Sequence, residues 1–123
     1  MEINIEHKPT YTIINLTGDL LNLTAAEALK SEIAALKEQG TLSFIVNLKN
    51  VEQMDMEAGN VLMELHEATY DAEGSLVFAE LKDDVHQMMK KGQLHLSLNL
   101  CPTMIEAIDI ISMELLERDL LNE

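Results

Sequence analysis

Apolar residues follow two spacings along this chain, one typical of strands and one typical of helices. Ile3 and Ile5 alternate with polar neighbours, as in a half-buried strand, whereas Leu29, Ile33 and Leu36 recur at helical spacing. Gly and Pro fall between these periodic segments and mark their ends. The pattern predicts strands at 3–5, 11–16, 44–48, 76–79 and 94–100, and helices at 24–40, 56–70, 83–91 and 103–121.

Two predicted helices begin with a Thr-x-x-Glu sequence, at Thr24–Glu27 and Thr103–Glu106. In such a capping box the Thr hydroxyl accepts from a backbone N–H, and the Glu carboxylate reaches back to the Thr N–H. The strand at 94–100 rests on a strict alternation of leucines with polar residues, which predicts one buried face.

Strands that alternate with helices indicate an α/β protein with a mostly parallel sheet. The chain has 123 residues, the size of one domain with one core, and no internal repeat or linker interrupts it. We therefore expect a single domain over residues 1–123, with about five strands and about four helices.

The charge balance narrows the class of partner. Twenty-two acidic against eight basic residues give a formal net charge of −14. Such a surface repels phosphate backbones and anionic lipid, so neither nucleic acid nor a membrane is expected as a partner. Cys101 is the only cysteine, and we find no basic-apolar leader and no membrane-spanning run, which predicts a cytoplasmic protein.

No residue pattern indicates catalysis. The four histidines lack metal-ligand spacing, no glycine-rich phosphate loop occurs, and Cys101 has no signature of an activated nucleophile. We expect no enzyme activity, no metal and no cofactor.

The segment from Asn47 to Leu65 passes from a buried strand through a short loop into a helix whose first turn reads Asp55-Met56-Glu57-Ala58. This resembles the hallmark of the STAS domain family, the anti-sigma factor antagonists. In that family a strand leads to Asp-Ser-Ser-Gly at a helix N-terminus, and a partner kinase phosphorylates the second Ser. The resemblance implies a STAS-like fold, with the helices mainly on one face of the sheet and the first strand antiparallel at an edge.

Two departures from the family pattern bear on phosphorylation. Glu57 stands at the position of the phosphorylated Ser, so the switch position carries a fixed negative charge. The family also typically reads Gly-Glu-(Leu or Ile)-Asp after the second strand, where this chain has Gly18-Asp19-Leu20-Leu21. Leu21 replaces an Asp that lies near the phosphorylation site in the family. Two hypotheses stay open: either Glu57 imitates phosphoserine, or the site has left phosphoregulation.

The second helix offers a candidate interface, because in the family this helix faces the kinase. Five polar residues at steps of three and four share one face, which we call the acidic stripe: Glu57, Asn60, Glu64, Glu67 and Asp71. The predicted partner-binding residues are Asp55, Met56, Asn60, Glu64, Glu67 and Asp19.

By resemblance, we expect a non-catalytic signalling protein that recognises a switch kinase, an anti-sigma factor of the histidine-kinase-like ATPase type. One alternative is a constitutive STAS subunit of a larger complex, such as an ABC transporter ATPase, and another is a small-ligand sensor. Homodimerisation through the strand at 94–100 or the final helix also stays open.

Overall fold

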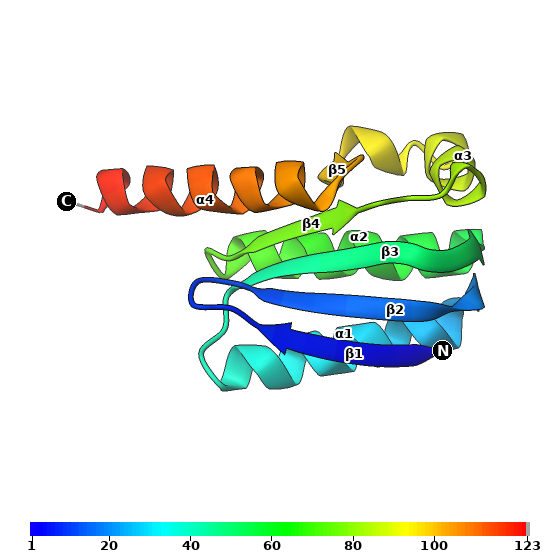
Figure 1. The fold of residues 1–123 in the computed structure, drawn as a ribbon, viewed down its shortest axis with the longest axis horizontal. Coiled ribbons are helices and arrows are strands. Elements are labelled where there is room, and N and C mark those ends of the chain that lie inside the picture. Colours follow the sequence, from blue (N-terminus) through cyan, green and yellow to red (C-terminus); the bar gives the residue numbers. More distant parts are fainter. Residues whose placement is uncertain (123) are drawn as a thin grey trace.

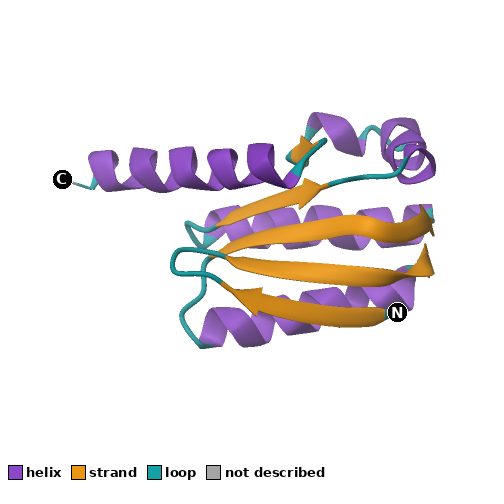
Figure 2. Ribbon diagram, in the orientation of Figure 1, coloured by secondary structure: helices purple, strands orange, loops and turns teal. Residues whose placement is uncertain are grey.

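The fold is described here from a computed structural model of the chain, over residues 1–122. Figure 2 shows strands and helices alternating along most of the chain. The strands are β1 (Glu2–His7), β2 (Thr12–Leu21), β3 (Ser43–Met54), β4 (Ser75–Ala79) and β5 (Leu100–Cys101). The helices are α1 (Leu23–Glu38), α2 (Met56–Asp71), α3 (Asp83–Lys91) and α4 (Met104–Leu121), with a short 3-10 helix, η1 (Leu94–Leu96).

All five strands form one mixed sheet in the order β1-β2-β3-β4-β5. β1 pairs with β2 in antiparallel register, and every other pairing is parallel. Both features confirm the prediction of a mostly parallel sheet with its first strand antiparallel at an edge.

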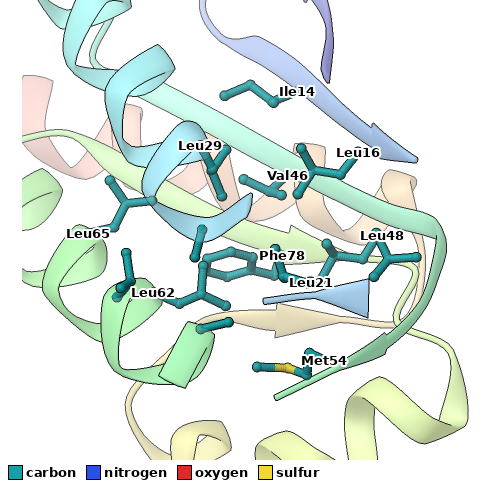
Figure 3. Close-up of a cluster of buried hydrophobic side chains, with 14 of the residues drawn as sticks. Ile14, Leu16, Leu21, Leu29, Val46, Leu48, Met54, Leu62, Leu65 and Phe78 are labelled. Atoms are coloured by element: carbon teal, nitrogen blue, oxygen red, sulfur yellow. The ribbon is translucent and has the colours of Figure 1, made fainter. Parts of the chain in front are cut away.

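Two clusters of buried side chains lie on opposite faces of the sheet. The larger cluster joins alternate residues of the central strands, such as Phe44 and Val46, to α1, α2 and α3 (Figures 1 and 3). The smaller cluster joins the intervening residues Ile45 and Val77 to Ile111 of α4. The helices therefore pack mainly on one face, as predicted, and α4 alone covers part of the other.

The predicted strand at 94–100 is wrong. Leu94–Leu96 forms η1, and only Leu100 and Cys101 pair with β4. The backbone turns because Gln93 adopts a left-handed conformation, with φ of 59°. Leu94 and Leu98 are buried one helical turn apart, whereas Leu96 is 73% exposed. An alternation of leucines can thus serve a short helical turn as well as a strand.

The edge of β4 explains why a longer β5 does not form. The Tyr70 hydroxyl accepts from the backbone N–H of Leu76 at 3.3 Å, and Asn99 Nδ2 lies 3.4 Å from the Leu76 carbonyl oxygen. These side chains occupy the backbone groups that another strand would need.

The boundary between β2 and α1 also differs from its prediction. β2 does not end at Thr17-Gly18 but continues to Leu21, after a register shift between Asn15 and Thr17. The N-cap of α1 is Asn22, whose Oδ1 accepts from Ala25 N at 2.9 Å. Thr24 lies inside the helix, since Asn22 is the first residue after the strand and caps equally well. The second predicted cap is correct, because Thr103 Oγ1 accepts from Glu106 N at 3.2 Å.

Candidate functional site

The predicted short loop before α2 is wrong, because β3 continues past Leu48 to Met54 and α2 begins directly after it. Met54 ends the strand, Asp55 is the N-cap, and Met56 is the first helical residue. Asp55 Oδ1 accepts from Ala58 N at 2.9 Å, and Asp55 N donates to the Leu21 carbonyl oxygen at 3.1 Å. The start of α2 is therefore fixed both to its own first turn and to the end of β2.

Replacing Asp55 with Ala should lower the free energy of unfolding by about 1 kcal/mol, because the Ala58 N–H loses its side-chain acceptor. Asp55→Asn keeps an acceptor oxygen and is the matched control. Urea unfolding followed by circular dichroism measures both variants. An equal loss in the two would show that the charge of Asp55, rather than its cap hydrogen bond, stabilises the helix.

Glu57 lies in the first turn of α2 and is exposed. The first N–H groups of a helix lack intrahelical acceptors, and the helix dipole is positive at this end, so a negative side chain is stabilised there. Among the residues described, no basic side chain pairs with Glu57. Its charge is thus presented to solvent at the start of α2.

Met56 is partly exposed and packs beside the segment that joins α3 to η1. A Cβ added at Gly92 would overlap the Met56 side chain, and one added at Gly59 would come 2.7 Å from Leu94 Cδ1. Close approach at these two glycines brings the α3–η1 segment against the first turns of α2. The candidate surface therefore includes this segment beside the N-terminus of α2.

Leu21 and Asp19 have different surroundings. Leu21 is fully buried in the larger core cluster, so position 21 carries an apolar side chain and no charge next to the start of α2 (Figure 3). Asp19 is exposed near the end of β2, between the pairings of Gly18 with Val51 and Leu20 with Gln53. The structure brings Asp19 to the same end of the sheet as the start of α2.

The acidic stripe lies on the exposed side of α2, as its spacing predicts. Asn60 and Glu67 are exposed and free of salt bridges among the residues described. Glu64 differs, because its Oε2 lies 3.1 Å from Lys30 Nζ of α1. This pair is exposed and so contributes little to stability, but it lowers the charge that Glu64 can offer a partner.

Basic residues near the start of α2 were not part of the predicted site. An open hollow of about 790 Å³ is lined by Met54 at the end of β3 and by Asp84, Lys90 and Lys91 of α3. In the sequence the two lysines suit only the C-terminal end of the helix dipole. Their place beside Met54 depends on how α3 folds back, which no local pattern shows.

A polar cluster holds α4 against the start of β4, away from the start of α2. Glu114 Oε1 accepts from the Tyr70 hydroxyl at 2.8 Å and from Ser75 Oγ at 2.6 Å. Arg118 donates to the Gly74 carbonyl oxygen at 2.6 Å and to Ser75 Oγ. Burial, and then the hydrogen bond to Glu114, raise the pKa of Tyr70 to about 12.

His66 borders the same cluster, with its ring 4.6 Å from the ring of Tyr70. Its Nδ1 is buried and has no hydrogen-bond partner. Burial lowers the pKa of His66, against the raising effect of Glu114 and Glu67. The neutral ring is therefore favoured in the folded state.

Residues 1–122 contain neither a candidate metal site nor a candidate membrane-spanning helix. No three His, Cys, Asp or Glu side chains gather there as a metal would require. None of the helices in that range combines the length and the apolar character needed to span a bilayer.

Known structures with this fold include anti-sigma factor antagonists. A putative anti-sigma factor antagonist from Thermotoga maritima is 15% identical, with a TM-score of 0.76 over 89% of this chain and 94% of that one. The anti-sigma factor antagonist SpoIIAA in its unphosphorylated form is 18% identical, with a TM-score of 0.73 over 90% of this chain and 96% of that one.

The same fold occurs inside a transporter. The murine anion transporter Slc26a9 is 11% identical, with a TM-score of 0.72 over 88% of this chain but only 18% of the transporter. No curated protein matches the chain. At these identities the likeness shows the fold alone.

A match to a family model assigns the chain to a family, because this comparison uses the sequence and not only the fold. The model of the STAS domain matches residues 2–107, from the first strand into the beginning of α4. The chain belongs to the STAS domain family.

Proposed function

We propose that this chain is a non-catalytic signalling protein of the anti-sigma factor antagonist type. Its partner is a switch kinase, an anti-sigma factor of the histidine-kinase-like ATPase class. The binding surface is formed by Asp55 and Met56 at the start of α2 and by Glu57 and Asn60, the N-terminal part of the acidic stripe. Asp19 lies at its border.

One observation carries this proposal: Glu57 is exposed, and no side chain of residues 1–122 forms a salt bridge with it, in the first turn of a helix that its cap and β3 hold in place. Phosphoserine carries about −1.5 to −2 charges and three acceptor oxygens. Glutamate offers one charge and two oxygens in the same helix-dipole field. Glu57 therefore gives the surface a permanent, weaker version of the phosphorylated state.

Leu21 supports the loss of phosphotransfer at this site. The family carries an Asp at the corresponding place, whereas the side chain of Leu21 is buried in the core. Without a hydroxyl at position 57 and without that Asp, a kinase would find neither the phosphate acceptor nor the carboxylate that the family places at this position. Partner choice would then depend on the amount of the protein rather than on its phosphorylation.

The test is affinity capture from the native cell lysate, with bound proteins identified by mass spectrometry. The baits are the wild type, Glu57→Ser and Glu57→Lys, with Glu38→Ser as a matched control. Glu38 is an exposed carboxylate at the C-terminal end of α1, so its replacement removes the same charge outside the proposed binding surface. In the family the phosphorylated form does not bind the kinase, so Glu57 should hold kinase binding weak. An ATPase-type kinase should therefore be captured at least tenfold more by Glu57→Ser than by the wild type or the control.

The constitutive-subunit alternative predicts a different result. A position that cannot be phosphorylated also suits a permanent subunit, and the fold occurs within a transporter chain. If all four baits capture one stable complex equally, and high salt does not release it, the switch proposal is wrong. Binding through the acidic stripe should instead weaken as ionic strength rises.

A further inference from the structure

α4 carries a second, separate surface on its solvent side. Its inner face packs on the sheet through Ala107 and Ile111, which are fully buried. Four large apolar side chains on the opposite face, which we call the outer stripe, are 60–74% exposed: Ile105, Met113, Leu116 and Leu120. Their spacing of eight, three and four residues keeps them on one side of a helix.

Met113, Leu116 and Leu120 form the contiguous part of the outer stripe, because the exposed Asp109 lies between Ile105 and Met113 on the same side of the helix. From Ile105 to Leu120 the outer stripe covers sixteen residues of helix, or roughly 22 Å at 1.5 Å per residue. In Figure 1 the C-terminal part of α4 runs past the ends of the strands, where no other element covers it. A continuous exposed apolar patch of this kind typically marks an interaction surface, whereas single exposed leucines do not.

The charged side chains around the outer stripe indicate which kind of partner could bind there. Four carboxylates on α4 are exposed and form no salt bridge among the residues described: Glu106, Asp109, Glu117 and Asp119. Arg118, the one basic residue of the helix, points inward to Gly74 and Ser75. Every free charge of α4 is therefore negative.

These charges disfavour two occupants. A second copy would place like-charged rims against each other, and each chain carries a formal net charge of −14. An anionic membrane surface would be repelled for the same reason. A cationic partner is instead attracted, and the apolar stripe supplies a seam for its apolar residues.

We propose that the outer stripe of α4 docks a cationic amphipathic helix of a partner protein. That helix would carry apolar residues at helical spacing, flanked on both sides by Lys or Arg. The surface is independent of the one proposed for a kinase, because α2 lies on the opposite face of the sheet from α4.

The test is a titration of the full ¹⁵N-labelled chain with three synthetic peptides of equal length, followed by NMR. The first peptide has a leucine stripe flanked by Lys and Arg, and the second has the same stripe flanked by Glu. The third has the composition of the first in an order that gives no apolar face. Only the first should bind, with shifts confined to the outer side of α4, and added salt should weaken it.

Two variants assign the binding to the outer stripe. The triple variant Met113→Gln/Leu116→Gln/Leu120→Gln should weaken the first peptide at least tenfold and keep the wild-type melting temperature, since all three side chains are exposed. Leu42→Gln, at an exposed leucine outside α4, should leave binding unchanged.

Several outcomes would overturn the proposal. Equal binding of the Glu-flanked or the reordered peptide would show that the stripe and its charges do not act together. Shifts centred on α2 would place the site elsewhere. Sedimentation that shows a dimer abolished by the triple variant would assign the stripe to a second copy, and vesicle binding abolished by that variant would assign it to a lipid surface.

Discussion

Replacing Gly74 with Ala is expected to lower the free energy of unfolding by about 3 kcal/mol or more, because a side chain has no room there. Gly74 lies between α2 and β4, where its N–H donates to the Thr69 carbonyl oxygen at 2.9 Å. An added Cβ would overlap the carbonyl oxygen of Leu42 and lie 3.1 Å from Thr69 Cγ2. The obstacle at Leu42 is backbone, which a change of side-chain rotamer cannot relieve.

Gly40→Ala is the matched control for Gly74→Ala. Gly40 has a φ of 96°, and nothing lies within 4 Å of the place a Cβ would take. Its replacement carries only the cost of the left-handed backbone, about 1 kcal/mol. Thermal and urea unfolding of both variants separate steric overlap from backbone strain, and a smaller loss at Gly74 than at Gly40 would contradict the predicted overlap.

Replacing Glu114 with Ala is expected to lower the free energy of unfolding by about 2–3 kcal/mol, because its carboxylate accepts two hydrogen bonds in a half-buried cluster. Tyr70 and Ser75 would lose their shared acceptor, and Arg118 would lose a carboxylate 3.7 Å away. The helix α4 should exchange its amide hydrogens faster, since this cluster ties it to the start of β4.

Glu117→Ala controls for the loss of a charge and a helical side chain on the same helix. Glu117 is exposed and makes no hydrogen bond or salt bridge among the residues described, so its replacement should change stability by less than about 0.5 kcal/mol. The pKa of Tyr70, about 12 in the wild type, should fall in Glu114→Ala and stay in Glu117→Ala. Equal stability of the two variants would show that α4 is held by its apolar face alone.

The element order and the parallel sheet could be predicted because each rests on a local pattern. Helical spacing at Leu29, Ile33 and Leu36 placed one face of α1 in the core, and all three are buried. Alternation at Ile3 and Ile5 predicted a half-buried strand, and both residues lie in β1. Such patterns predict structure reliably because folding buries one apolar face of each helix or strand.

The segment after α3 could not be predicted, because its conformation depends on contacts distant in the sequence. Tyr70 and Asn99 occupy the edge of β4 that a strand at 94–100 would need. Leu94 and Leu98 are instead buried one helical turn apart, not on one face of a strand. A strand requires a partner edge, and no local pattern reports whether that edge is free.

The start of α2 was recognised from four residues, whereas its surroundings were not. Asp55 caps the helix as its residue type suggests, and Glu57 is exposed beside it. The approach of Gly92 to Met56, the pairing of Glu64 with Lys30, and the lysines beside Met54 all join separate elements. Contacts of this kind follow from the tertiary packing of α1 and α3, which spacing along α2 does not encode.

The direct passage from β3 into α2 has a consequence for recognition. No residue separates the end of the strand at Met54 from the cap at Asp55, so the surface around Glu57 has no hinge of its own. A partner meets a shape that already exists in the free protein, and little conformational entropy is lost there on association. Changes at position 57 should therefore alter how long a complex lasts more than how fast it forms.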